Sequence, residues 1–272
     1  MQHILKTEWL KIKKYPAFWW VMGITALTYP GINYIFHGVY VDITQDNNKK
    51  GEILKALIGN PFSFPEAWHT VAYLSSIFVF IPAIVVIMLI TNEYTYKTNR
   101  QNIIDGWSRK EFMFAKMIDV AILTAIVTVL FSTVAFIMGI TNTEDKSADH
   151  WSMIYYVGLF ALQTFSQLSL AFMTGLLLRK SFIALAVFSF YFIILEPIGV
   201  NVLKYKYKSG IGEYFPLEIS QKLLPKPAFI GRLDEAAYQT SLDAVKYHVG
   251  YTLALVLITW FFCFWLNNRR DL

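Results

Sequence analysis

The sequence is poor in charged residues and has almost no cysteine. Asp, Glu, Lys and Arg make up 16% of its 272 residues, whereas soluble domains carry about 25%. Cys263 is the single cysteine, which excludes a disulfide or a cysteine metal cluster within one chain. A soluble globular domain and a small disulfide-bonded domain are therefore both excluded.

The usual motifs of catalysis are missing as well. GLLLRKS at 175–181 lacks the second glycine of a phosphate-binding loop and follows no strand, so we predict no ATP-hydrolysing site in this chain. There is no G-x-S-x-G motif, no H-E-x-x-H motif and no pair of aspartates within an apolar run. We therefore predict no catalytic residue, no metal site and no cofactor of its own.

Long apolar runs dominate what is present. Hydrophobic residues make up 56% of the chain, and a nearly uncharged run of about 18 residues or more can cross a membrane as a helix. Six runs qualify: 17–36, 71–92, 113–140, 151–178, 182–203 and 245–266. They predict an all-α membrane protein of six transmembrane helices, in which 1–272 is a single domain without a soluble part.

The basic residues predict how the helices are oriented. Those near the expected inner ends of the runs are Lys11, Lys13, Lys14, Lys97, Arg100, Arg109, Lys110, Arg179, Lys180, Arg269 and Arg270. This positive-inside pattern places both termini in the cytoplasm. It also explains the excess of Lys and Arg over Asp and Glu without nucleic acid, which we do not expect as a partner. The first run is too long for a cleavable signal peptide and stays in the bilayer.

Two further segments are expected at the membrane surfaces. Residues 1–15 place Trp9 and Ile12 on one helical face and most lysines on the other, which predicts an interfacial amphipathic helix ended by Pro16; the alternative is a frayed basic tail. Residues 211–230 are too apolar for a free loop and too rich in proline for a span, so they predict short re-entrant or interfacial helices on the outer side.

Residues 91–117 form a polar, basic connection between the second and third runs. Thr98 and Gln101 have the spacing of a capping box, so a helix is expected to begin there. Gly106 suits the left-handed residue after a helix end, and Ser108 with Glu111 forms a second capping-box pattern before the third run. These signals together predict a short cytoplasmic helix over 99–105. Its Ile103 and Ile104 either pack against the ends of the spans or enter a groove on another protein.

At these residues the sequence resembles a known family. NEYTYKTNRQNIIDGWSRKEFMFAKM is similar to the signature of type-2 ATP-binding-cassette (ABC) exporter permeases, in which an acidic residue leaves the second span and a T-x-R…G-x-S-R-x-x-F…K pattern enters the third. The matching residues are Glu93, Thr98, Arg100, Gly106, Ser108, Arg109, Phe112 and Lys116. Trp107, between the glycine and the serine, is a small departure from this pattern.

This resemblance implies a function and a set of partners. The helix at 99–105 corresponds to a coupling helix that docks on an ATPase subunit, with coupling residues Glu93, Thr98, Arg100, Gln101, Ile103, Ile104, Asp105, Gly106, Ser108 and Arg109. Two permeases, identical or paralogous, would pair in the bilayer of a bacterial inner membrane with two cytoplasmic ATPases. ATP and Mg²⁺ would bind in those ATPases.

The polar residues of the fourth span and Glu196 of the fifth span each have two possible roles. Gln163, Thr164 and Gln167 lie near one face of the fourth span, where they either join helices by hydrogen bonds or line a substrate path. Glu196 lies in the fifth span, where a carboxylate is costly. It either faces a cavity or, with Pro197 after it, marks a break in the helix.

Other classes of function stay open from the residues alone. His37, His69, His150 and His248 all fall near expected outer helix ends, so a membrane-embedded enzyme or a protein that handles a metal or cofactor is the second hypothesis. Interfacial histidines without any ligand are the simpler alternative. A secondary transporter is a third possibility, but neither inverted repeats nor several charges at mid-membrane are present.

Overall fold

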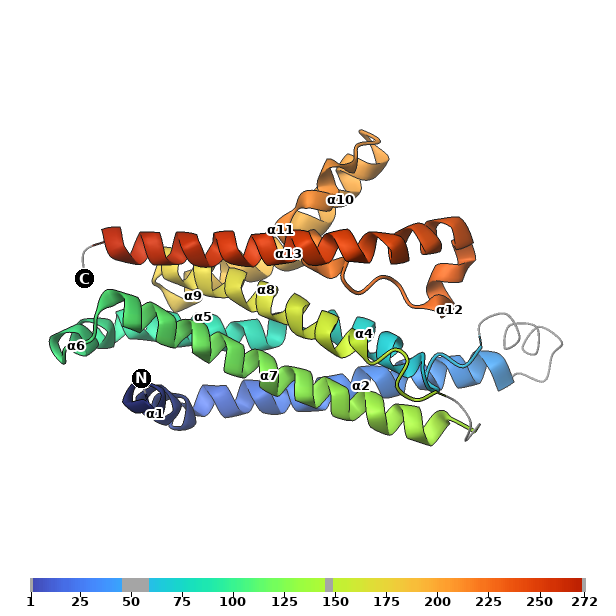
Figure 1. Cartoon of the computed structure of the whole chain (residues 1–272), viewed down its shortest axis with the longest axis horizontal. Helices are drawn as coiled ribbons and strands as arrows, with labels where there is room; N and C mark the ends of the chain where they lie inside the picture. Colours follow the sequence, from blue (N-terminus) through green and yellow to red (C-terminus); the bar gives the residue numbers. More distant parts are fainter. Residues whose placement is uncertain (1, 46–58, 145–148, 271–272) are drawn as a thin grey trace.

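Helices make up nearly all of the structure. The computed structural model describes residues 2–45, 59–144 and 149–270, and within these ranges there is no β-strand. The described residues form six long helical segments (Figure 1). They are α2 (Pro16–Gln45), α4 (Ala67–Ser76) with α5 (Phe80–Thr95), α7 (Arg109–Asn142), α8 (Tyr155–Leu178), α9 (Ser181–Phe190) with η1 (Tyr191–Leu195) and α10 (Glu196–Tyr205), and α13 (Glu235–Arg269).

Most of these segments can cross a membrane. Four continuous segments, 109–142, 155–178, 181–205 and 235–269, are long and apolar enough, and the bent pair of α4 and α5 would make a fifth. The sixth, α2, is 30 residues long, or about 45 Å at 1.5 Å per residue, but its Tyr, Thr and Asn residues leave it less apolar. The prediction of a multi-pass membrane protein is thus confirmed, while the count of six spans stays a prediction.

The second span is bent where a single continuous helix was predicted over 71–92. The axes of α4 and α5 differ by 49° across a break at 77–79. Pro82 lies in the first turn of α5, where it has no N–H to donate to the preceding turn and cannot continue α4 without a clash. The bend therefore has a cause that is visible in the sequence.

One end of the bundle carries both termini. Figure 1 shows the N-terminus with α1 (Gln2–Lys13), the C-terminus and α6 (Thr98–Ile104) together at one end, here called the α6 end. This arrangement fits an even number of crossings. Helix α1 confirms the helix predicted over 1–15; its place in the membrane interface and the cytoplasmic side of the termini stay predictions.

Helix α8 is at the centre of the packing. It contacts α4, α5, α7, α9, α11 and α13, and its buried side chains include Phe160, Leu168 and Phe172. Gly175 brings α8 close to α5, because a Cβ there would lie 2.5 Å from the Cγ2 atom of Ile90. Small residues allow this close approach between membrane helices.

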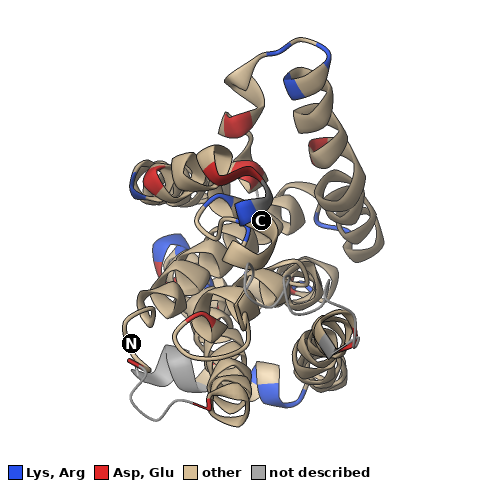
Figure 2. Ribbon diagram, turned by 90° about the vertical axis from the view of Figure 1, so that its right-hand side faces the viewer, with Lys and Arg blue, Asp and Glu red and all other residues tan. Residues whose placement is uncertain are grey.

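An arm leaves the bundle after α9. Figures 1 and 2 show α10 standing away from the other helices, and Figure 2 shows long stretches of ribbon without charged residues. The short helices η2 (Gly210–Tyr214), α11 (Pro216–Gln221), α12 (Ala228–Gly231) and η3 (Arg232–Asp234) lead back to α13. Short helices are therefore present in the predicted segment 211–230, whose membrane position stays a prediction.

Candidate functional site

Helix α6 forms a compact projection between α5 and α7. It begins after Lys97, whose φ of 56° turns the chain sharply away from α5. At its other end, Gly106 N–H donates to the Ile103 carbonyl at 3.1 Å and Trp107 N–H to the Asn102 carbonyl at 3.0 Å. These two bonds make a Schellman motif, and Gly106 has the positive φ, 98°, that it requires. The predicted glycine stop is confirmed.

The predicted Thr98–Gln101 capping box is not formed. Lys97 occupies the N-cap position and α6 has no side-chain cap. The Thr98 hydroxyl instead donates to the carboxylate of Glu93. A hydrogen bond to an ionised carboxylate is stronger than one between a neutral hydroxyl and a backbone N–H. The Gln101 side chain donates to Asp105 Oδ1 at 3.2 Å. The sequence pattern was correct about where a helix begins but wrong about the bonds that start it.

The second capping box is formed as predicted. The Ser108 hydroxyl accepts from Glu111 N at 3.2 Å, and Ser108 N donates to Glu111 Oε2 at 2.8 Å. This box starts α7 directly after the α6 turn. The segment between α5 and α7 is therefore fixed at both ends by local bonds rather than left as a free loop.

The two isoleucines of α6 have different surroundings. Ile104 is 78% exposed, whereas Ile103 is half-buried. Three polar side chains are exposed beside Ile104: Arg100, Gln101 and Asp105. Asn99 and Asn102 are buried and face the bundle. The helix thus presents a mixed apolar and charged face outward, around an isoleucine that the chain itself does not cover.

Five charged side chains form a largely buried network next to α6. We call Glu8 and Lys11 of α1, Glu93 of α5, and Lys116 and Asp119 of α7 the charge cluster. Lys116 Nζ lies 2.8 Å from Glu93 Oε1 and 3.5 Å from Asp119 Oδ2, and it also pairs with Glu8. Lys11 Nζ lies 3.0 Å from Glu8 Oε1 and 3.0 Å from Glu93 Oε1. The cluster therefore ties α1, α5 and α7 together.

The two lysines keep Glu8 ionised although it is buried. Burial alone would raise the pKa of the Glu8 carboxyl, but Lys116 and Lys11 outweigh it and hold that pKa below its usual value. Because Thr98 donates to Glu93, the first turn of α6 is joined to the same cluster. A displacement of α6 would thus act directly on these charges.

Arg109 forms hydrogen bonds to backbone carbonyls of its own chain. Its Nη1 donates to the carbonyls of Asn267 at 3.2 Å, Asn268 at 2.9 Å and Arg270 at 2.9 Å, which lie at the last turn of α13. Carbonyl groups at a helix end lack partners within the helix and carry partial negative charge. Arg109 therefore joins the start of α7 to the end of α13, while Arg100 is left exposed.

The polar residues of α8 are buried and mostly unpaired. Gln163, Thr164, Ser166 and Gln167 are at most 1% exposed. The side-chain oxygen of each of these four residues has no hydrogen-bond partner in the described part of the chain. The Gln167 side chain does donate one hydrogen bond, from its Nε2 to Ser220 Oγ at 3.3 Å. Buried polar atoms are rarely left without partners, so this side of α8 is unusual for interhelical packing alone.

Glu196 lies apart from α8, at the start of α10. It lines a cavity between α10, η2 and α11, and its Oε1 accepts from Glu218 N at 2.7 Å. The helix does not end at Pro197; it changes to π-type hydrogen bonding over Tyr191–Leu195 and continues. Helix α11 lies between Glu196 and the polar residues of α8. Its Glu218 N–H donates to Glu196, and its Ser220 hydroxyl accepts from Gln167.

The four histidines considered as ligands take part in separate packing contacts. His69 stacks on Tyr156 with ring centroids 4.1 Å apart and bonds the Pro225 carbonyl at 2.8 Å. His248 lies 3.2 Å from the Ile219 carbonyl, and the rings of His37 and His150 pack on Phe62 and Phe64. Within the described ranges no three His, Cys, Asp or Glu residues are placed to hold a metal ion together. No observation favours the enzyme or metal hypothesis.

The structure is thus a multi-pass helical bundle with a short helix that is fixed at one end of it and faces outward. Comparison with protein families gives the particular class. Residues 4–195 match the family described as ABC-2 family transporter protein, and the chain belongs to this family. No curated protein shows a significant match. Membership makes the chain a permease subunit of an ABC transporter, a class that works with an ABC ATPase and generally lacks an ATPase site of its own.

Sequence reasoning did not bring the charge cluster together. Lys116 and Glu93 were part of the family resemblance and Lys11 was considered only for the orientation of the helices, whereas Glu8 and Asp119 were not considered. A signal was present, since Lys116 and Asp119 lie three residues apart within the apolar run 113–140. Charges there are costly unless they are paired. The partner in α1 could not be identified, because nothing local connects residue 8 to residue 116.

Proposed function

We propose that this chain is the membrane subunit of a bacterial ATP-driven exporter and that α6 is its coupling helix. Two copies, or one copy and a paralogue, would form the substrate path in the cytoplasmic membrane. Two cytoplasmic ATPases would bind ATP and Mg²⁺ and dock on α6. Family membership supports the permease and its ATPase partner; export, pairing and the docking site are the proposal.

The exposed face of α6 is the observation that carries the proposal. Ile104 is 78% exposed at the tip of a bundle end, where a monomer gains nothing from displaying it. Arg100 and Asp105 flank it with opposite charges. An apolar anchor within a charged rim is the usual composition of a protein interface, and a helix that fills a groove is a common way to build one.

The contacts behind α6 provide a route for coupling. Thr98 and Glu93 join α6 to the charge cluster, which in turn joins α1, α5 and α7. Closure of the ATPases on ATP would displace α6, and a fixed helix transmits this displacement as a rigid-body motion of the spans attached to it. In this account the charge cluster holds α1 and the second and third spans together during the motion.

The substrate path is assigned to the buried polar side of α8. Gln163, Thr164 and Gln167 supply oxygen atoms that lack partners within the described residues, and such atoms favour a site that water or a polar substrate can fill. Glu196, beyond α11, would lie near the outer end of that path. These four residues are the ones in which substitutions should alter transport rather than assembly.

Weakening the apolar contact of α6 tests the docking role. We expect Ile103→Ala/Ile104→Ala to lower the amount of ABC ATPase that co-purifies with the full chain from native membranes by about tenfold. Loss of about 1.4 kcal/mol is sufficient for that change, and truncation of a buried isoleucine in a core costs about 2–5 kcal/mol. Quantitative mass spectrometry of the purified complex gives the ratio of ATPase to permease.

Ile43→Ala provides the matched control. Ile43 is 51% exposed and lies near the end of α2 farthest from α6 (Figure 1). This variant should retain the ATPase at the wild-type ratio. If the α6 variant also retains it, α6 is not the docking helix, whatever the membrane topology.

A further inference from the structure

The arm encloses a cavity that is lined by Glu196, the residue proposed above for the outer end of the substrate path. Its volume is about 540 Å³, and it lies between α10, η2 and α11. This size is within the range of small-molecule sites. Except for Phe192, all its lining residues follow residue 195, where the family match ends. The cavity is therefore a feature of this chain rather than one inferred from the family.

A buried carboxylate without an ion pair in the described residues lies at one end of the cavity. Glu196 is 2% exposed. Its Oε1 accepts from Glu218 N at 2.7 Å; its Oε2 makes no hydrogen bond of ordinary geometry in the described residues, although the Tyr191 hydroxyl interacts with the carboxylate. A buried carboxylate is costly when no opposite charge is near it, and the ammonium group of a ligand would supply that charge.

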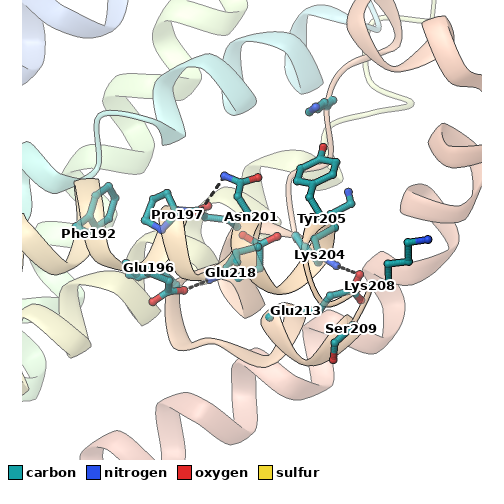
Figure 3. A pocket seen from close by; sticks show the side chains of 17 residues that line it. Phe192, Glu196, Pro197, Asn201, Lys204, Tyr205, Lys208, Ser209, Glu213 and Glu218 are labelled. Carbon is teal, nitrogen blue, oxygen red and sulfur yellow. Dashed lines mark hydrogen bonds and ion pairs between the residues drawn. The ribbon is translucent and has the colours of Figure 1, made fainter.

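Lysines lie toward the other end. Lys204, Lys208 and Lys226 line the cavity and form no ion pair within the described part of the chain, whereas Lys222 pairs with Glu213 at 2.8 Å. Figure 3 shows Glu196 at one side of the view and Lys204 and Lys208 at the other. Glu213 and Glu218 line the same hollow, but its four lysines outnumber these two carboxylates. The hollow therefore attracts an anion at this end, and lysine is a common phosphate ligand.

The spacing between the two ends sets the kind of ligand. Glu196 and Lys204 are eight residues apart in α10, or about 12 Å along the helix axis and about 80° around it, and both line the cavity. Phe192, Val200 and Leu217 supply apolar wall near the carboxylate. The site therefore suits a molecule with a cationic group and an anionic group separated by a short apolar linker.

We propose that this cavity binds a primary ammonium group and a phosphate of one ligand, with the ammonium at Glu196 and the phosphate at Lys204 and Lys208. The phosphoethanolamine head of a membrane lipid and a free aminophosphate share this chemistry. Binding at this site requires neither the ATPase nor transport. It can therefore be tested independently of the docking role of α6.

The test measures binding to the purified full chain in nanodiscs of phosphatidylcholine. Three short-chain lipids are titrated and followed by calorimetry: one with a phosphoethanolamine head, one with a phosphocholine head and one with a bare phosphate head. Free phosphoethanolamine is the fourth probe. We expect the phosphoethanolamine lipid to bind at least tenfold more tightly than the other two lipids, because they lack N–H donors for Glu196. Comparable binding of free phosphoethanolamine would identify a soluble ligand, and its absence a lipid.

Substitutions then assign the two ends. Glu196→Gln retains an oxygen that can accept from Glu218 N, so α11 should stay in place, and it should remove the preference for the ammonium group. Lys204→Gln/Lys208→Gln should weaken every phosphate probe at least tenfold. Lys246→Gln, an exposed lysine of α13 outside the cavity, should leave all affinities unchanged. The proposal is wrong if the wild-type chain binds none of the probes or does not distinguish the three lipid heads.

Discussion

Lys116 contacts more carboxylates than any other residue of the charge cluster. Its ammonium group pairs with Glu8, Glu93 and Asp119 and is only 4% exposed. Lys116→Met would leave Glu8 and Glu93 with Lys11 alone and would remove the ion pair of Asp119. Loss of one partner from a buried ion pair costs about 3–5 kcal/mol. We expect a clearly lower Tm for this variant, measured on the purified full chain in nanodiscs.

Lys11→Met is the comparison for that prediction. Lys11 takes part in the same network but is 31% exposed, so solvent screens its pairs and their loss should cost about 1 kcal/mol or less. Adding Glu8→Gln to Lys116→Met should recover part of the lost stability, because it removes one uncompensated charge. Equal Tm values for the two lysine variants would show that the cluster contributes no more than surface pairs do.

Glu8 gives the cluster a dependence on pH. The neighbouring lysines hold its pKa below the ordinary value in the folded chain. Its ionised form therefore stabilises the fold above the pKa of the unfolded chain, and this contribution is lost as the pH falls through the lowered folded pKa. Glu8→Gln should lower Tm at neutral pH, and the difference from wild type should shrink in acid. A difference that stays constant from pH 7 to pH 3 would contradict this role.

Residue-level prediction succeeded where the interactions are local. Ser108 and Glu111 are three residues apart and form their capping box without help from the rest of the chain. Thr98 has the same spacing to Gln101, but the Glu93 carboxylate competes for its hydroxyl. Glu8 could not be assigned a partner at all, because Lys116 is 108 positions away. Sequence spacing thus identified contacts within one turn and not the buried pairs between helices.

At the scale of elements, α6 depends on the turn that ends it. Gly106 has a φ of 98°, and a Cβ there would meet no atom within 4 Å. The cost of Gly106→Val is therefore conformational, since valine strongly disfavours positive φ. We expect the variant to be inserted and folded, with ATP hydrolysis of the complex at least partly uncoupled from transport. Gly106→Ala should show a smaller defect in the same direction.

The measurement is the ratio of ATP hydrolysed to substrate moved in reconstituted vesicles. Gly158→Val, a glycine of α8 whose Cβ would also meet no atom within 4 Å and whose φ is helical, is the control for the substitution itself. An unchanged ratio for Gly106→Val would show that the direction of α6 does not matter for coupling.

The spans could be predicted because their apolar length is itself the signal. Each predicted run lies largely within one of the long helical segments. The bend between α4 and α5 was missed, although Pro82 marks it, because a proline near a helix end and a proline at a bend look alike in sequence. The unpaired oxygens of α8 follow from tertiary packing and have no sequence signature.

For the whole molecule, we propose different roles for the α6 end and for the arm. The α6 end holds both termini (Figure 1), the charge cluster and the exposed face of α6, and it is where we place the ATPase. The arm, with Glu196 and its lysine-lined cavity, belongs to the part of the chain beyond the family match. We therefore propose that the α6 end couples the chain to its ATPase and that the arm binds a ligand.

A photo-crosslink from position 104 shows directly whether an ABC ATPase covers α6. A benzoylphenylalanine at Ile104, which is 78% exposed, would touch whatever covers α6 in native membranes, and the same group at Ile43 serves as the control. The account predicts a product at position 104 that contains an ABC ATPase, identified by mass spectrometry, and none at position 43. Crosslinking of the ATPase at position 43 and not at position 104 would contradict the assignment of α6 as the coupling helix.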